Sequence, residues 1–158
     1  MAEIASTFRS IVGDENVLTR EIDTAYYRTG FRYGSGGAVA VVFPKTLVEQ
    51  WRVLEAAVEA GCAIIMQATK TGLTGGSSPS GFDYDRDVVI INVGRIRGLR
   101  LLRGGTQALA FPGTTLFELG QELKEIDRVP HSVLGSTSIG ATVIGGVANN
   151  AGGALCKR

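Results

Sequence analysis

The chain contains few of the residues on which metal sites and disulfide frameworks depend. It has one histidine and two cysteines among 158 residues. A single histidine excludes a histidine-rich metal site. The two cysteines, Cys62 and Cys156, are too few for the disulfide framework of a small secreted domain, so we expect a reducing compartment. The sequence therefore predicts no metal site.

An excess of charge and a long apolar run are also missing. Sixteen basic residues balance 15 acidic ones to a net charge of +1, without the basic patch that nucleic-acid binding needs. The N-terminal residues lack the basic region and apolar core of a signal peptide. Residues 129–155 carry no formal charge when His131 is neutral, but six of them are glycine and seven are serine, threonine or asparagine. A bilayer span needs ~20 mainly apolar residues. We therefore expect a buried, polar-studded surface that faces a ligand or another domain.

Glycine, by contrast, is abundant. The 22 glycines make up about 14% of the chain, twice the usual ~7%. They follow no repeat, which indicates tight turns and close approach of the backbone to other groups. The most notable stretch is residues 67–81, QATKTGLTGGSSPSG, where we expect an irregular backbone. Consecutive N–H groups in such a loop can form an anion-binding concavity, and a flexible surface loop is the alternative.

The hydrophobic pattern of the first part of the chain predicts a mixed α/β structure. Apolar spacing indicates helices over residues 4–12 and 19–27, and AVAVVF indicates a strand over residues 38–43. Thr46 and Glu49 match a capping box at the start of the next helix. That helix is expected to end at Gly61 and to bury a stripe made of Leu47, Trp51, Leu54 and Val58. With AIIMQ at residues 63–67 as a second strand, it forms a β-α-β unit with parallel strands.

The rest of the chain continues the mixed pattern without internal repeats. A buried strand is expected over residues 88–93, and a hairpin over residues 99–102 and 108–111, around two glycines. Thr115 and Glu118 again match a capping box, which opens a helix that runs to about residue 123. From His131 onward periodicity disappears.

Three familiar motifs fail on the residues that they require. The glycines at 34 and 36 precede a strand, and Val39 stands where a Rossmann fingerprint needs its third glycine. Lys70 and Thr71 could end a P-loop, but the glycine before them is missing. Residues 83–87, DYDRD, resemble part of an EF-hand loop without its glycine and distal glutamate, so a solvated turn is expected. We expect a structural role for His131, no catalytic residue in this segment, and a bound cofactor that supplies the chemistry.

Four stretches together resemble the FAD-binding domain of the vanillyl-alcohol oxidase family, which has the PCMH-type fold. They are, in chain order, QATKTGLTGGS, YDRDVVIINVGRI, PGTTLFEL and PHSVLGSTSIGATVIGGVANNAGG. The resemblance runs from about residue 31 to the end, and the last stretch is the most specific. It implies an α+β fold in which a small parallel β-α-β subdomain precedes a second, mixed or antiparallel α+β subdomain. It also implies FAD as the cofactor.

Matched residue by residue, the resemblance implies two groups of cofactor-binding residues. The first lines the FAD diphosphate and consists of Ala68, Thr69, Lys70, Thr71, Gly72, Gly76 and Ser77. The second lies close to the flavin and consists of Gly135, Thr142 and Gly152, surrounded by Gly140, Gly145, Gly146 and Asn150. Pro112 and Gly113 resemble the family's turn near the adenosine half. Relatives have roughly GGGTS where this chain has ATKTG, so the side chain of Lys70 either faces the phosphate or points to solvent.

The resemblance also implies a division of the chain and an activity. Residues 1–30 would be a helical lead-in, 31–94 the first subdomain and 95–158 the start of a second subdomain that is truncated here, so this segment alone is expected to be inactive. The likeness is greatest to peripheral inner-membrane members of the respiratory chain. These oxidise D-lactate and pass electrons through FAD to quinone on the cytoplasmic side. The acid–base residues and the membrane contact would belong to later segments. Two alternatives stay open: oxidation of glycolate or another 2-hydroxy acid, and a nucleotide-binding module without redox activity.

Overall fold

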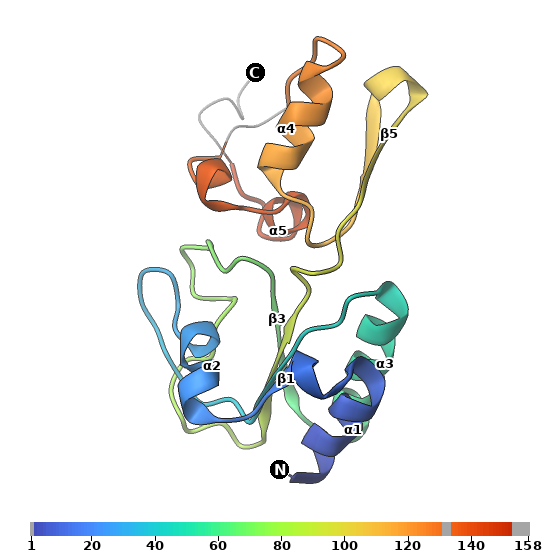
Figure 1. Ribbon diagram of the computed structural model, residues 1–158. Coiled ribbons are helices and arrows are strands. Elements are labelled where there is room, and N and C mark those ends of the chain that lie inside the picture. The colour runs from blue at the N-terminus through green and yellow to red at the C-terminus, as the bar shows by residue number, and fades with distance from the viewer. Residues whose placement is uncertain (1, 131–133, 153–158) are drawn as a thin grey trace. The chain divides into compact units, whose positions relative to one another are not determined.

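The computed structural model describes residues 2–130 and 134–152 and divides the chain into two compact units (Figure 1). The first unit comprises residues 1–95 and the second residues 96–158. Each unit has its own sheet and helices, and each is described by itself. His131 and Cys156 lie outside the described residues.

The first unit is built on a four-stranded sheet with the order β1-β2-β4-β3. Strands β2, β4 and β3 run parallel, and β1 pairs antiparallel with β2. The elements are α1 (Ala2–Val12), a 3-10 turn (Asp14–Asn16), β1 (Val17–Leu18), α2 (Glu21–Arg28), β2 (Ala40–Val42), α3 (Leu47–Glu59), β3 (Ala63–Gln67) and β4 (Val88–Asn92). The predicted strands and helices are confirmed to within two residues at their ends. The two strands of the β-α-β unit are parallel as predicted, but β4 lies between them.

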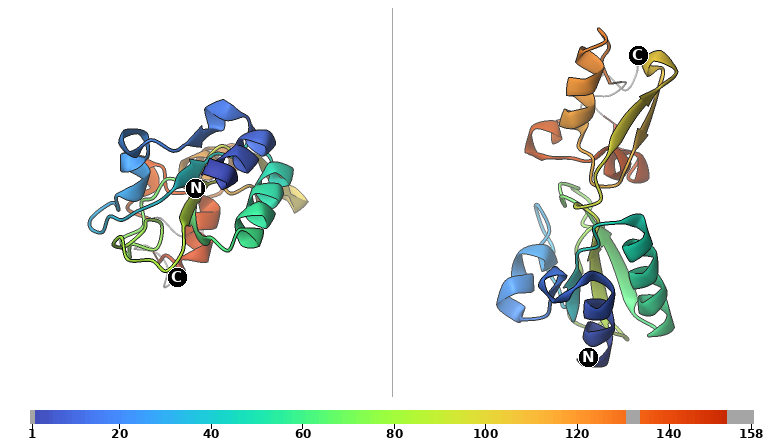
Figure 2. Two further views of the ribbon diagram at one scale, coloured as in Figure 1. Left: turned by 90° about the horizontal axis from the view of Figure 1, so that it is seen from below. Right: turned by 45° about the vertical axis from the view of Figure 1, so that its right-hand side comes forward.

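Helices cover both faces of this sheet, with α2 on one side and α1 and α3 on the other (Figures 1 and 2). On the α2 side, Val41 and its register partner Ile90 pack with Phe43 and Tyr27. On the other side, Val42 and Ile91 have no exposed surface. A parallel sheet covered on both faces needs strands that are apolar throughout, which explains the uninterrupted VVII of β4.

The start of α3 differs from prediction in one hydrogen bond. Thr46 caps the helix, because its side chain accepts a hydrogen bond from the backbone N–H of Glu49. The carboxylate of Glu49 accepts from the backbone N–H of Lys45 at 2.6 Å and not from Thr46. The predicted capping box is therefore only half formed. At the other end, Gly61 follows the helix with a φ of 67°, as predicted.

The predicted buried stripe of α3 is wrong. Trp51 and Val58 are 64% and 62% exposed, Leu47 is also exposed, and Val53 and Ala57 are the buried residues. Apolar residues occur on more than one side of this helix, so helical spacing alone could not select the face that packs. The smaller residues face the sheet, where they allow close approach of helix and strands.

The second unit combines an antiparallel hairpin with short helices. The predicted hairpin is confirmed and consists of β5 (Leu99–Leu102) and β6 (Gln107–Ala110), which a 3-10 turn (Arg103–Gly105) joins. Helix α4 (Leu116–Lys124) follows, and Thr115 and Glu118 form the complete predicted capping box. A 3-10 turn (Thr137–Ile139) and α5 (Val143–Ala148) complete the described elements. The residues of α5 show no helical periodicity, so this helix was not predicted.

The core of the second unit is small. Leu116, Leu134 and Ala141 pack together, and the backbone N–H of Leu116 donates to the carbonyl of Ala141 at 2.8 Å. In the described part of residues 129–155, only Leu134, Ala141 and Thr142 are buried. Most of its described residues are thus not buried by this chain itself, and the prediction that they face a ligand or another domain stays a prediction.

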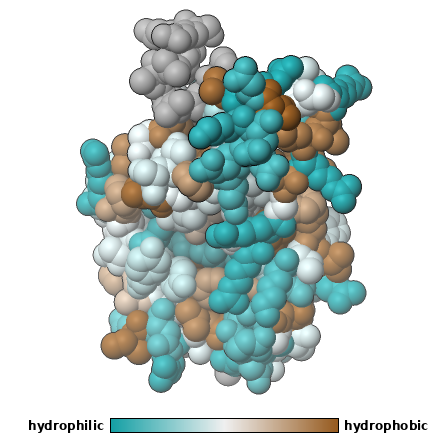
Figure 3. All heavy atoms as spheres, turned by 45° about the horizontal axis from the view of Figure 1, so that its top comes forward, coloured by the Kyte–Doolittle hydropathy of each residue, from teal (hydrophilic) through white to brown (hydrophobic). Residues whose placement is uncertain are grey.

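Neither unit contains, in the ranges that the structure describes, a helix with the length and apolar character for a membrane crossing. Hydrophobic and hydrophilic residues are interspersed on the face drawn in Figure 3.

Candidate functional site

The loop that follows β3 leaves the sheet at the carboxyl ends of its parallel strands. This edge is where open α/β sheets bind their ligands. As predicted, the loop has no regular structure between Ala68 and Gly81. Three of its residues have left-handed backbones, Lys70 with a φ of 45° and Gly75 and Gly81 with a φ of 78° each. The loop contains no acidic residue, so nothing in it repels an anion.

Gly72 and Gly76 leave open space in front of the loop backbone. A Cβ added at Gly72 would meet no atom within 4 Å, and one at Gly76 would meet only the hydroxyl of Thr74, at 3.9 Å. Neither glycine has the positive φ that by itself favours glycine. Among the described residues, no protein acceptor bonds the N–H groups of Thr71, Gly72 and Gly76. Open space in front of free N–H donors fits a bound diphosphate.

The ammonium group of Lys70 contacts α2 and the glycine-rich segment that follows it. The Nζ atom donates a 2.7 Å hydrogen bond to the carbonyl of Thr29 and lies 3.9 Å from the centre of the Tyr26 ring. Partial burial lowers the pKa of Lys70 below its ordinary value. The side chain is half-buried, so the prediction that it points to solvent is wrong.

A second glycine-rich loop, residues 29–37, lies beside the first, and sequence reasoning missed this contact. Gly36 and Gly81 form a parallel bridge, and the N–H of Gly37 donates to the carbonyl of Gly81 at 3.0 Å. A Cβ at Gly36 would stand 2.3 Å from the carbonyl oxygen of Gly81, so only glycine allows this approach. Arg28 also stabilises the second loop, because its guanidinium donates a hydrogen bond to the carbonyl of Gly36 at 3.0 Å.

Two buried amides under the loop were also missed. Gln67 ends β3, Asn92 ends β4, and their side chains share a hydrogen bond of 3.1 Å. The available signal was a single amide at the end of each of two apolar runs, AIIMQ and VVIIN.

The second predicted group of site residues belongs to the second unit. Thr142 is buried and caps α5, because its hydroxyl oxygen accepts a hydrogen bond from the N–H of Gly145 at 3.1 Å. This leaves the hydroxyl hydrogen of Thr142 available to another acceptor. Gly135 and Gly152 are exposed, and a Cβ at Gly135 would meet nothing within 4 Å. The two predicted groups therefore belong to different units.

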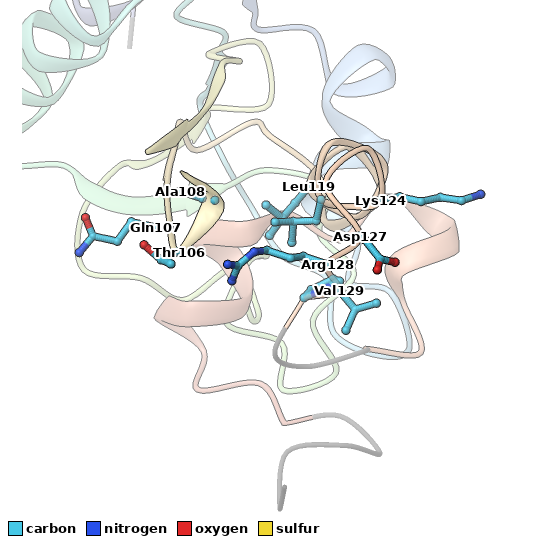
Figure 4. Close-up of a pocket in the computed structure, with 11 residues that line it drawn as sticks. Thr106, Gln107, Ala108, Leu119, Lys124, Asp127, Arg128 and Val129 are labelled. Carbon is cyan, nitrogen blue, oxygen red and sulfur yellow. The ribbon is translucent and has the colours of Figure 1, made fainter. Parts of the chain in front are cut away.

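A cleft of about 550 Å³ lies in the second unit between the hairpin and α4. Its walls include Ala108, Leu119 and Arg128, and Arg128 extends between the helix and the hairpin in Figure 4, whereas Lys124 points away. None of the predicted site residues lines it.

No metal centre is found in the part of the chain that the structure describes. No three histidine, cysteine, aspartate or glutamate side chains there are grouped as ligands for a metal ion. The DYDRD segment, residues 83–87, is exposed, as expected for a solvated turn.

Comparison with known proteins shows the family of the chain. Residues 38–158 match a family described as FAD binding domain. The chain belongs to this FAD-binding domain family. The cofactor implied by the sequence resemblance, FAD, is thereby confirmed for the family.

Two curated relatives of this FAD-binding domain are quinone-dependent D-lactate dehydrogenases. The protein of Escherichia coli (strain K12) is 57% identical over 148 residues, which are 94% of this chain and 26% of that protein. The protein of Haemophilus influenzae is 49% identical over 156 residues, which are 99% of this chain and 28% of that protein. The resemblance found in the sequence is thus confirmed. The chain spans about a quarter of the length of these relatives.

Solved structures confirm the fold of the FAD-binding domain. Alkyldihydroxyacetonephosphate synthase matches with a TM-score of 0.82 at 16% identity, over 97% of this chain and 30% of that one. p-Cresol methylhydroxylase matches with a TM-score of 0.72 at 19% identity, over 92% of this chain and 28% of that one. The predicted PCMH-type α+β fold is therefore correct.

Proposed function

We propose that this chain is the FAD-binding part of an enzyme that oxidises D-lactate to pyruvate and passes the electrons through FAD to a quinone. The observation that carries this proposal is the 57% identity to a quinone-dependent D-lactate dehydrogenase over 94% of the chain. In the proposed reaction, D-lactate loses two electrons and two protons, and the quinone gains them to become the quinol.

The residues of the β3–β4 loop bind the diphosphate in this proposal. They are Ala68, Thr69, Lys70, Thr71, Gly72, Gly76 and Ser77. Three supporting features are the free N–H groups at residues 71, 72 and 76, the open space at the two glycines, and the absence of acidic side chains. Thr69, Thr71 and Ser77 add hydroxyl donors to these N–H groups. For Lys70, the proposal concerns the backbone, since the ammonium group is engaged elsewhere.

Gly135, Thr142 and Gly152 lie near the flavin in this proposal. Thr142 is fixed by its cap bond to Gly145 and retains a hydroxyl hydrogen to donate. The two glycines let the flavin approach the backbone closely. When bound, FAD supplies the two-electron acceptor that the side chains of this segment lack.

We further propose how the segment fits into the complete enzyme. Residues 1–30 are a lead-in, residues 31–94 the first FAD-binding subdomain, and residues 95–158 the beginning of the second. The acid–base residues, the binding of D-lactate, and the membrane contact belong to segments outside this chain. The enzyme would then lie on the cytoplasmic side of the inner membrane as a peripheral protein.

A visible absorption spectrum of the purified full-length protein tests the proposal. The expected result is a flavin spectrum that D-lactate bleaches and that an added quinone restores. A flavin spectrum that responds to glycolate or another 2-hydroxy acid, and not to D-lactate, would overturn the substrate and keep the cofactor. A colourless protein that takes up no added FAD would overturn both.

A further inference from the structure

Gln67 and Asn92 form a buried pair at the carboxyl edge of the parallel sheet. They are register partners at the ends of β3 and β4, and their residues are only 2% and 6% exposed. Both follow the alternation that places Ile65 and Ile90 on the α2 side of the sheet, so both side chains lie on that side. Two uncharged amides thus lie directly under the loop that we propose for the diphosphate.

All four amide hydrogens of the pair are used. Gln67 donates through Nε2 to the carbonyls of Tyr27 at 2.9 Å and Ser77 at 2.6 Å. Asn92 donates through Nδ2 to Oε1 of Gln67 at 3.1 Å and to the carbonyl of Ala68 at 3.0 Å. The remaining acceptor, Oδ1 of Asn92, receives the N–H of residue 94 at 3.0 Å. A buried network with every member satisfied holds its partners in one arrangement.

Two of these partners are the two ends of the proposed diphosphate loop. Ala68 begins the loop and Ser77 is the last residue proposed to contact the phosphate, and both carbonyls are bound by the pair. The bond to Tyr27 fixes the same network to the end of α2. The base of the loop is therefore closed before any ligand arrives, and a loop held in its bound shape loses less entropy on binding.

We propose that Gln67 and Asn92 are positioning residues that hold the 68–77 loop in the shape that receives the FAD diphosphate. Neither amide contacts the cofactor in this proposal, and both act through the backbone of the loop. The proposal rests on the proposed FAD binding of the chain.

The test measures FAD affinity in full-length apoprotein for the wild type, Gln67→Met, Asn92→Leu and the double variant. Both substitutions keep side-chain volume and leave carbonyls of the loop without a partner. Each single variant is expected to weaken FAD binding by about tenfold. Because the two amides share one network, the double variant should be weakened much less than the product of the single effects.

Asn16 provides the matched control. It is also a buried amide of the first unit, but the hydrogen bonds of its side chain engage Val12, Glu15 and Arg95 and no residue of the loop. Asn16→Leu removes the hydrogen bonds of a buried amide, one of them from the guanidinium of Arg95. It is expected to lower the melting temperature as much as Gln67→Met does and to leave FAD affinity within about twofold of the wild type.

Gln67→Glu adds a readout that a merely structural role would not move. At neutral pH its carboxylate would face the carbonyls of Tyr27 and Ser77 without a hydrogen to donate. A protonated carboxyl regains one donor, so FAD affinity of this variant relative to the wild type should recover as the pH falls from about 8 to about 5.

The outcomes separate this proposal from the one on which it rests. Wild-type protein that binds no FAD overturns both. If the wild type binds FAD and Gln67→Met binds it equally well, or weakens only as much as Asn16→Leu, the positioning role is overturned and the proposed function stands.

Discussion

The ammonium group of Lys70 lies 3.9 Å from the centre of the Tyr26 ring, and it donates a hydrogen bond to the carbonyl of Thr29. These contacts connect the β3–β4 loop to α2 and to the residue that follows it. Both partners are uncharged, and an ammonium group over an aromatic face is attracted by the ring quadrupole. The only cationic side chain of the loop is thus already bound by groups of the protein, the carbonyl of Thr29 and the ring of Tyr26.

We predict that Lys70→Met leaves FAD affinity within about threefold of the wild type. The reason is that the ammonium group holds the neighbouring loop and does not pair with the diphosphate. Fluorescence titration of full-length apoprotein with FAD at two salt concentrations measures this. The salt dependence of the affinity should be the same for the variant and the wild type, since no charge pair is lost.

Lys45→Met is the control for the change in net charge. Lys45 is an exposed lysine of the same unit, and its ammonium group lies 3.4 Å from the carboxylate of Glu15. If Lys70→Met instead weakened FAD binding by much more than Lys45→Met and flattened its salt dependence, the ammonium group of Lys70 would have to move to the diphosphate on binding.

Gly72→Val and Gly76→Val are predicted to weaken FAD binding by about tenfold, or ~1.4 kcal/mol. Each valine would fill space that is open in front of the loop backbone. Since the added Cβ meets no crowded protein atom, the melting temperature should change little. Titration with FAD and thermal unfolding of the same samples check both statements.

Gly36→Ala, by contrast, should lower the melting temperature of the protein. Its Cβ would stand 2.3 Å from the carbonyl oxygen of Gly81, so the variant should lose stability even without FAD.

Unchanged FAD affinity in both Gly72→Val and Gly76→Val would contradict the prediction that these two glycines line the diphosphate site.

The order of helices and strands could be predicted from the sequence, because each element depends on local signals. Capping at Thr115, the αL residue at Gly61 and the apolar run of β4 are visible in a few neighbouring residues. The position of the loop after β3 followed from the same signals. These signals did not show which glycines leave room for a ligand and which are needed for close packing of the backbone. That difference depends on the atoms that lie opposite each glycine in the fold.

Contacts between segments that are distant in the sequence could not be predicted from such local patterns. Gln67 and Asn92 are 25 residues apart, and Lys70 meets Thr29 across 41. The prediction of the buried face of α3 was wrong for a related reason. Its apolar residues surround the helix, so only the sheet decides that Val53 and Ala57 pack and Trp51 does not.

The exposed and buried faces of α3 predict unequal effects of substitution in the 158-residue chain. Val53→Ala removes two methyl groups from a site with no exposure and should cost ~2 kcal/mol of unfolding free energy. Trp51→Ala should cost no more than about 0.5 kcal/mol. Urea unfolding followed by circular dichroism measures both, and the order would be reversed if the stripe predicted from the sequence were the packed one.

Acid is predicted to weaken the second unit through Glu118. Its carboxylate accepts hydrogen bonds from the backbone N–H of Thr115 at 2.6 Å and from the Thr115 hydroxyl at 2.9 Å. The backbone bond holds the pKa of Glu118 below its ordinary value of 4.5. Because the folded pKa is the lower one, the contribution of the carboxylate to stability is complete above the unfolded pKa and is lost as the pH falls through the folded pKa.

Glu118→Ala and Glu118→Gln measure this contribution by urea unfolding across the same pH range. The carboxylate is partly exposed and screened, so Glu118→Ala should cost under ~1 kcal/mol at neutral pH. The cost should shrink once the pH is well below 4.5, the ordinary pKa of the group. Glu118→Gln keeps an acceptor and loses the titrating group, so its stability should lack this acid-dependent step. A cost of Glu118→Ala that stays constant from neutral to acid pH would mean that the capping bond does not depend on the charge.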